Sequence, residues 1–238
     1  MTDTPRPVLG VLGGMGPLAT VDFLAKLIEE TPAQYDQDHV PVVVYSVPQI
    51  PDRPAAILAG GETPLPAMIA GIRTLKRAGA RAIAIPCNTA HFWYDDLVRD
   101  GGLPVLHIAD AACAAFARHG LAAGSVGLVA TRGTIAAGFF QARLATRGCR
   151  CITSTDEDLD RLVLPAIAAV KRNDLAHAHA LALRAACNLR DAGADAILLA
   201  CTEIPPALEY AASPVAAICI DATRALAAEC VAWWRDYP

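Results

Sequence analysis

Two segments of this chain, residues 79–87 and 193–201, are near-copies of one another, and both end in a cysteine. Each begins with Gly-Ala, continues as an apolar run typical of a buried strand, and reaches its thiol, Cys87 or Cys201, at the end of that run. Other segments match in the same order, at separations of about 110 to 117 residues: 8–14 with 126–133, and 104–111 with 214–222. The sequence therefore predicts an internally duplicated fold that presents one thiol from each half.

Strand-like and helix-like segments alternate in both halves, which is the pattern of parallel sheets covered by helices. The chain is 54% hydrophobic and only 18% charged, as expected for strands that are buried on both faces. The strands expected in the two halves are 8–12, 42–47, 82–85 and 105–108, then 126–130, 151–154, 196–199 and 216–220. The expected helices are 19–30, 65–78 and 91–99, then 138–145, 156–171, 175–192 and 205–211. We therefore predict two pseudo-symmetric three-layer α/β domains with mainly parallel central sheets.

Both cysteines fall at the carboxyl ends of predicted strands, where parallel sheets bind their ligands. Each also precedes a predicted helix start, whose N–H groups and dipole lower the pKa of a thiol. Two buried core thiols preserved by the duplication are the alternative. Polar residues follow each thiol, Asn88-Thr89 in one copy and Thr202-Glu203 in the other. Apolar packing does not need such residues, so we favour two reactive thiols.

Composition excludes several classes of function. A net charge of −4 gives no basic surface for a nucleic-acid partner. We expect no membrane partner, because no uncharged run is long enough to span a bilayer. Residues 1–7 lack the charge pattern of a signal peptide, so we expect a cytoplasmic protein with eight reduced cysteines. We also expect no metal, since His177 and His179 point to different helix faces and Cys149-Arg150-Cys151 matches no common zinc spacing.

Two further motifs have alternative interpretations. Residues 14–19 fit the G-x-G-x-x-A pattern of a dinucleotide site, but the next strand carries no carboxylate for a ribose. We favour a tight turn that exposes N–H groups to a small anion. His91 follows Cys87 by four residues, and a Cys–His nucleophile pair would use this spacing, although no hydrolase signature accompanies it.

The segments GGMGPLAT at 13–20, PCNTAH at 86–91 and ACTEI at 200–204 together resemble the aspartate/glutamate racemase family, amino-acid racemases that work without pyridoxal phosphate. The resemblance covers nearly the whole chain. It implies a reaction without any cofactor, in which one cysteine removes the α-proton as a thiolate and the other returns a proton as a thiol. By the same resemblance, residues 1–111 plus 216–238 form the first domain and 112–215 the second, the active site lies in the cleft between them, and the protein is a homodimer.

The resemblance also implies the site residues. Arg53 and Lys171 match the cations that hold the side-chain carboxylate in aspartate racemases. Glu203 either holds the substrate ammonium or orients Cys201, unless it is only a first-turn acid at a helix start. The full predicted set comprises catalytic Cys87 and Cys201 and substrate-binding Met15, Gln49, Arg53, Asn88, Thr89, Thr131, Lys171, Thr202 and Glu203.

The sequence departs from the glutamate racemases of cell-wall synthesis. It lacks their aspartate near the glycine turn, and its second cysteine is followed by Thr-Glu instead of Thr-His. We therefore expect a racemase of aspartate, or of glutamate, involved in D-amino acid metabolism. The alternatives are a related isomerase or decarboxylase that resembles maleate isomerase, hydantoin racemase or arylmalonate decarboxylase, and a non-catalytic amino-acid-binding protein. A thiol-redox protein would carry Cys-x-x-Cys, which neither cysteine site shows.

Overall fold

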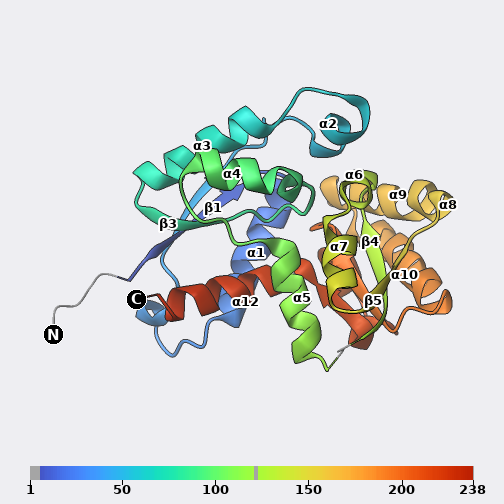
Figure 1. The fold of residues 1–238 in the computed structure, drawn as a ribbon. Helices are drawn as coiled ribbons and strands as arrows, with labels where there is room; N and C mark the ends of the chain where they lie inside the picture. Colours follow the sequence, from blue (N-terminus) through green and yellow to red (C-terminus); the bar gives the residue numbers. More distant parts are fainter. Residues whose placement is uncertain (1–5, 121–122, 238) are drawn as a thin grey trace.

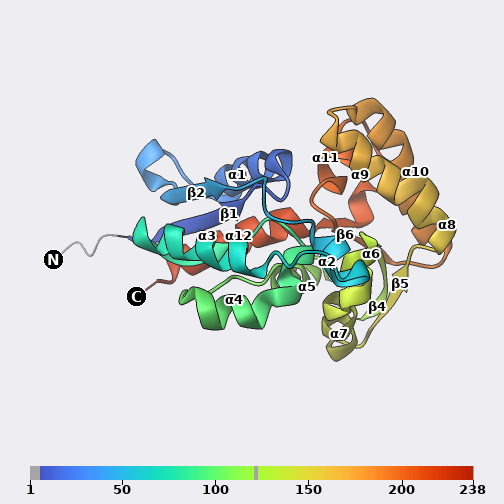
Figure 2. The ribbon, with the colours of Figure 1, turned by 90° about the horizontal axis from the view of Figure 1, so that it is seen from above.

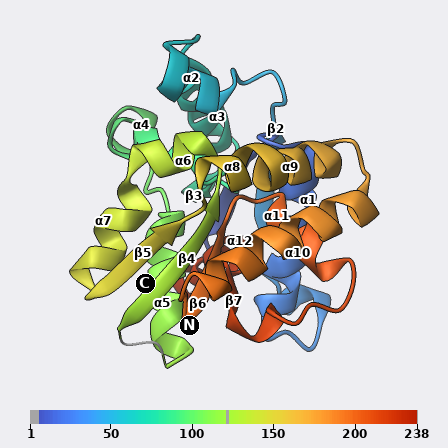
Figure 3. The ribbon, with the colours of Figure 1, turned by 90° about the vertical axis from the view of Figure 1, so that its right-hand side faces the viewer.

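The computed structural model describes residues 6–120 and 123–237 and contains one parallel sheet in each half of the chain (Figure 1). In the first sheet the order is β2 (Val42–Ser46), β1 (Val8–Gly13), β3 (Ala80–Ala84). The second sheet, whose strands lie side by side in Figure 3, has the order β5 (Cys149–Thr153), β4 (Gly124–Ala130), β6 (Ala196–Ala200), β7 (Cys219–Asp221). All pairings are parallel, which confirms the predicted α/β class.

Three apolar cores cover the faces of the two sheets. The first sheet packs against α3 (Leu65–Arg77) and α4 (Tyr94–Gly101) on one face. The second packs on one face against α9 (Leu164–Lys171), α10 (Leu175–Asp191) and α11 (Ile204–Glu209). The core between the halves holds side chains of both sheets and of four helices: α1 (Pro17–Glu30), α5 (Ile108–Arg118), α7 (Phe139–Thr146) and α12 (Ala222–Arg235).

Each strand contributes to two cores by alternation. On β1, Leu9 and Val11 enter the core between the halves, whereas Leu12 faces α3. On β6, Leu198 enters that same core and Ile197 faces α10. Because successive side chains point to opposite faces and both faces are covered, these strands read in the sequence as continuous apolar runs.

Several predicted elements differ from the structure at their ends. Residues 105–108 make a single β-bridge, Val105 to Ile83, because His107 already accepts a hydrogen bond from the N–H of Ala109 and begins α5. The predicted helix 91–99 is a 3-10 turn (Thr89–Trp93) followed by α4. The predicted helix 156–171 is divided into α8 (Asp156–Asp158), a π turn (Leu159–Val163) and α9, where a proline lacks the N–H that a continuous helix needs. The predicted strand 216–220 is a 3-10 turn (Ala216–Ile218) followed by β7.

The C-terminal segment contacts both halves. Strand β7 pairs with β6, so the prediction that the last strand groups with the first half is wrong for these residues. Helix α12, in contrast, packs against α1 and α5 and lies beneath the first sheet (Figures 1 and 2). The exact domain boundary stays a prediction.

Candidate active site

Cys87 lies three residues after β3 and belongs to the same apolar core as the buried side chains of Ile83 and Ile85. The N–H of Cys87 donates to the carbonyl of Ile85, and the 3-10 turn follows directly. His91 on that turn is buried, and its Nδ1 lies 3.0 Å from the backbone carbonyl oxygen of Cys87. Burial lowers the pKa of His91 to about 4, so the ring is neutral. The ring holds the backbone of Cys87 and does not pair with its thiol, which argues against the Cys–His nucleophile pair.

Cys201 occupies the equivalent place after β6 and carries a hydrogen bond that Cys87 does not share. Its Sγ donates to Oε2 of Glu203 across 3.1 Å, and Oγ1 of Thr202 donates to the same oxygen across 3.2 Å. Burial, and next the negative charge of Glu203, raise the pKa of the Cys201 thiol well above its ordinary value. The expected lowering of the pKa by a helix start is therefore wrong at Cys201. Helix α11 has only six residues. Its dipole lowers the pKa of the thiol, but the negative charge of Glu203 raises that pKa.

The two cysteines line one cavity of about 40 Å³ between the halves. All the residues predicted for the site line this cavity except Gln49. Gln49 lies exposed on the turn after β2. Sequence reasoning missed three lining residues, Asp52, Pro54 and Ile167. Asp52 caps α2 (Arg53–Ala59), and Pro54 lies in the first turn of this helix. An aspartate followed two residues later by a proline is the sequence signal that indicates this helix start. The complete lining is Met15, Asp52, Arg53, Pro54, Cys87, Asn88, Thr89, Thr131, Ile167, Lys171, Cys201, Thr202 and Glu203.

Helix α2, which contributes Arg53 and Pro54 to this cavity, joins the halves by packing against α6 (Arg132–Ala137), and the two helices lie near one another in Figure 1. The contact is close, because a Cβ on Gly133 would lie 2.9 Å from Cα of Pro54. Hydroxyl groups add a second connection. Oγ1 of Thr89 lies 3.2 Å from Oγ1 of Thr131 and 2.8 Å from Oγ1 of Thr134. The first cysteine loop is thus tied directly to the second half.

The glycine turn before α1 forms another wall. Gly14 has a φ of +91°, and a Cβ there would lie 2.4 Å from the backbone of Val47, so only glycine fits. The N–H of Gly14 donates to Oγ1 of Thr20, which in turn donates to the carbonyl of Gly16. A Cβ on Gly16 would lie 3.5 Å from Oε1 of Glu203, which brings this turn next to the Cys201 loop. The predicted tight turn is present.

Two polar side chains of the cavity have buried atoms without a hydrogen-bond partner among the described residues. In Asn88 both Nδ2 and Oδ1 are of this kind. In Arg53, Nη1 donates to the carbonyls of Ile50 and Pro51 and Nη2 to that of Met15, whereas Nε is buried and unpaired. Both side chains therefore have hydrogen-bonding capacity left for a ligand in the cavity.

A groove of about 670 Å³ adjoins the cavity. Asp52, Arg53, Lys171 and Glu203 line both the cavity and the groove. The rest of the groove comes mainly from the start of α1 and from the end of α9. The groove therefore meets the cavity that holds the two thiols at these four shared residues.

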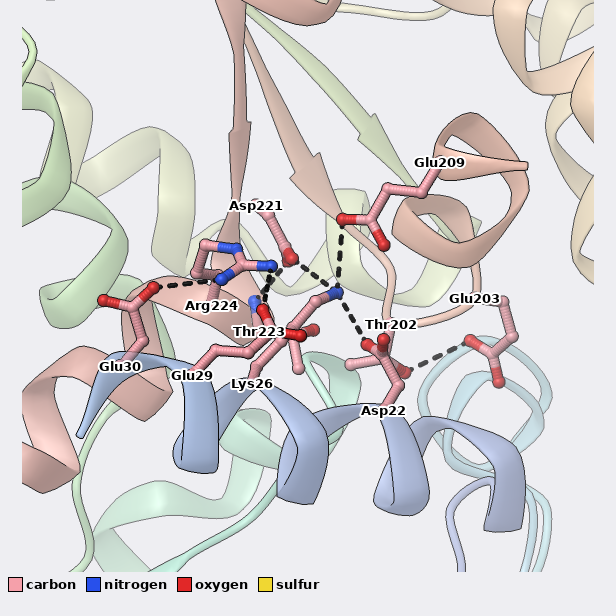
Figure 4. A network of polar contacts seen from close by, with 10 residues as sticks. All are labelled: Asp22, Lys26, Glu29, Glu30, Thr202, Glu203, Glu209, Asp221, Thr223 and Arg224. Carbon is pink, nitrogen blue, oxygen red and sulfur yellow. Dashed lines mark hydrogen bonds and ion pairs between the residues drawn. The ribbon is translucent and has the colours of Figure 1, made fainter. Parts of the chain in front are cut away.

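A charged cluster lies beside Thr202 and Glu203, the residues that follow Cys201 (Figure 4). Lys26 of α1 is only 2% exposed, and its Nζ lies 2.7 Å from carboxylate oxygens of both Asp22 and Asp221. Glu209, at the end of α11, is 3.7 Å away. The cluster thus connects α1 with β7 and with the helix that follows Cys201.

Within residues 6–120 and 123–237, no group of three or more His, Cys, Asp or Glu side chains is arranged to hold a metal ion.

Comparisons with known proteins agree with this geometry. The sequence profile of the family described as Asp/Glu/Hydantoin racemase matches residues 12–230. The chain belongs to this family. It is therefore an isomerase, a racemase that acts on amino acids.

Individual relatives extend the comparison. The chain is 29% identical to the broad-specificity amino-acid racemase RacX of Bacillus subtilis, over 97% of this chain and 99% of that protein. The structure of an aspartate racemase from Picrophilus torridus superimposes with a TM-score of 0.84 at 33% identity, covering 96% of this chain and 94% of that one. A glutamate racemase from Francisella tularensis, solved in complex with D-glutamate, has the same fold, with a TM-score of 0.67 at 15% identity over 97% of this chain and 81% of that one.

Proposed function

We propose that this racemase inverts an acidic amino acid, aspartate or glutamate, by a two-base mechanism with Cys87 and Cys201. The single observation that carries the proposal is that both thiols, each from a different half, line one cavity. Racemisation needs a base on one face of Cα and an acid on the other. Two like residues suit a reaction whose product mirrors its substrate.

The proposed step is balanced in protons. A thiolate takes the α-proton, the electron pair stays on the substrate as a planar carbanion or enolate, and the opposite thiol donates its proton to the other face. The reverse reaction exchanges the two roles. We assign Cys87 and Cys201 to these roles, and each well-placed proton transfer contributes about 10²–10⁴-fold in rate.

The α-carboxylate gains negative charge in this step and needs donors that are already in place. Asn88 is the strongest candidate, because its amide is buried in the cavity without a partner. Thr89 and Thr131 also line the cavity with their hydroxyls, whereas the hydroxyl of Thr202 already donates to Glu203. We assign Asn88, Thr89 and Thr131 to the α-carboxylate, where one lost donor costs about 3 kcal/mol of transition-state stabilisation.

The assignment to an acidic substrate depends on Arg53 and Lys171, which line both the cavity and the groove. Arg53 is fixed by three backbone carbonyls, and its free Nε is the donor that we assign to the side-chain carboxylate. The likeness to an aspartate racemase supports this choice. The likeness to a racemase of broad specificity makes neutral amino acids the necessary comparison.

The test is incubation with each L-amino acid in D₂O without added cofactor. We expect aspartate or glutamate to give the D-enantiomer with deuterium at Cα, at a kcat/KM at least tenfold above that of alanine or methionine. Exchange with neutral amino acids alone would contradict the substrate assignment. An absence of exchange with every amino acid would overturn racemisation and leave a decarboxylase or a binding protein.

We further propose a cytoplasmic homodimer. All eight cysteines are free thiols, as in a reducing compartment. Helix α1 and strand β2, which lie near one another in Figures 2 and 3, expose apolar side chains that a partner copy could cover. These side chains are Leu18, Val21, Ile28, Val44 and Tyr45. Among the described residues no helix is long and apolar enough to cross a membrane. Light scattering should give twice the chain mass of 24.9 kDa, and a monomer would contradict the assembly.

A further inference from the structure

The two copies carry different residues two positions after each cysteine. Thr89 stands in that position after Cys87, and Glu203 stands there after Cys201. The side chain of Glu203 turns back to its cysteine and accepts from Sγ of Cys201 across 3.1 Å. The hydroxyl of Thr89 turns away to Thr131 and Thr134 in the other half. No side chain in residues 6–120 and 123–237 makes a hydrogen bond with Sγ of Cys87.

The two thiols are otherwise matched in their surroundings. Each is 5% exposed, each follows a buried strand, and both face the same cavity. Solvent access therefore does not distinguish them. The only charged group in hydrogen-bond contact with either thiol, among the described residues, is the carboxylate of Glu203.

The contact between Sγ of Cys201 and Oε2 of Glu203 favours the protonated thiol over the thiolate. An ionised carboxylate only accepts hydrogen bonds, and Oε2 of Glu203 already accepts from Oγ1 of Thr202. Glu203 is itself buried, so a thiolate at 3.1 Å from it would place two negative charges together in a site of low dielectric. Cys201 avoids this arrangement when it keeps its proton.

We propose that Glu203 is a positioning residue that holds the proton on Cys201, so that the free enzyme exists mainly in one protonation form, with Cys201 as the acid and Cys87 as the base. The kinetic meaning of this inference rests on the proposed racemase function. In the favoured form, Cys87 takes the α-proton and Cys201 gives its own proton to the opposite face. Turnover leaves Cys87 as a thiol and Cys201 as a thiolate beside Glu203. This less stable form returns by proton exchange with water or by reaction with the opposite enantiomer.

The asymmetry has a kinetic signature that equilibrium constrains. Two enantiomers have equal free energy in water, so kcat/KM must be the same in both directions. The unequal stability of the two enzyme forms then appears in kcat and KM separately. We expect kcat to differ between the D and L directions in the natural protein, with KM changing in proportion. In Glu203→Gln the two kcat values should converge.

The direct test needs no substrate. The protein is treated with iodoacetamide, which reacts with thiolates, and modification of each cysteine is followed by mass spectrometry. The pH is raised in steps until one of the two thiols reacts. We expect Cys87 to react first and at least tenfold faster than Cys201. The same reaction in guanidinium chloride, where both peptides are exposed, gives the reference ratio.

Glu203→Gln removes the negative charge but keeps the shape, and should bring the two rates within about threefold of each other. Glu157→Gln, at an exposed glutamate of α8, is the control and should leave the ratio unchanged. Equal rates in the natural protein, faster reaction of Cys201, or an unchanged ratio in Glu203→Gln would overturn the inference. These results are distinct from failure of the racemase proposal, which would show as an absence of deuterium exchange.

Discussion

At the scale of single residues, the surroundings of a side chain reveal more than its type. Cys87 and Cys201 are equally buried and follow equivalent strands, yet among the residues that the structure describes only Cys201 has a carboxylate partner. Asn88 and Asn188 show the same contrast. Asn188 donates to Asp158 across 2.9 Å, whereas both polar atoms of the Asn88 amide are buried without a partner. The Asn88 amide therefore has hydrogen-bonding capacity that a substrate in the cavity can use.

Asn88→Ala should therefore separate activity from stability. We expect kcat/KM to fall about 10²–10³-fold, because a donor to the developing charge is lost. The free energy of unfolding should stay the same or rise, since no hydrogen bond within the protein is removed. Asn188→Ala is the matched control and should keep its activity while losing about 1 kcal/mol of stability. Racemisation assays and urea unfolding measure both effects, and a stable, fully active Asn88→Ala would contradict the assignment.

At the scale of elements, two buried histidines connect the Cys87 loop with the start of α5. The rings of His91 and His107 are 4.8 Å apart. Burial lowers the pKa of His91 to about 4, and burial together with the neighbouring His91 lowers that of His107 to about 2. Both rings are therefore neutral in the folded protein at neutral pH.

Stability should fall as the pH falls through the window that these pKa values set. Below the ordinary histidine pKa of about 6.5 the unfolded chain binds protons that the folded protein refuses. The contribution is fully present above pH 6.5, and for His91 its loss reaches about 3 kcal/mol near pH 4, at 1.36 kcal/mol per unit. His107→Asn keeps an acceptor for the N–H of Ala109 and should flatten this dependence. His177→Asn, at an exposed histidine of α10, should not. Urea unfolding between pH 7.5 and 4.5 measures the slope, and identical slopes in all three proteins would contradict the explanation.

Element type followed from the sequence more readily than element ends. Runs such as residues 196–200 are apolar on both faces and bounded by glycine and polar residues, so a buried strand was predictable. Helix α2 was not expected, because its short span carries no buried residue and is defined by its cap and by its contact with α6. Gln49 was predicted to line the cavity but lies outside it. It belongs to a turn, and no sequence period determines in which direction a turn side chain points. Tertiary contacts settle such details.

At the scale of the whole molecule, the site exists because two halves meet. The duplication visible in the sequence predicted that both thiols lie at carboxyl edges of parallel sheets, and the structure brings them to one cavity. The partners that join the halves could not be predicted, because they are long-range contacts. The charged cluster around Lys26 is one example, since it links α1 with β7 and α11 (Figure 4).

Lys26→Met should test how strongly that cluster holds the halves together. The substitution leaves the carboxylates of Asp22 and Asp221 without their buried cation, and breaking such a pair costs about 3–5 kcal/mol. Arg99→Met, which removes an exposed cation that pairs with Asp96 and Asp100, should change stability little. Urea unfolding at pH 7 compares the two variants. Equal, small losses would show that the cluster contributes nothing to the joint.

In the proposed mechanism, two thiols act from opposite sides of one substrate. Its most direct test is the rate of racemisation in both directions, followed by circular dichroism, for the natural protein, Cys87→Ser and Cys201→Ser. We predict that each serine variant folds normally and loses at least 10²-fold in both directions, because a serine hydroxyl is a far weaker acid than a thiol and is not ionised at neutral pH to serve as the base. Either variant turning over both enantiomers at a near-normal rate would contradict it.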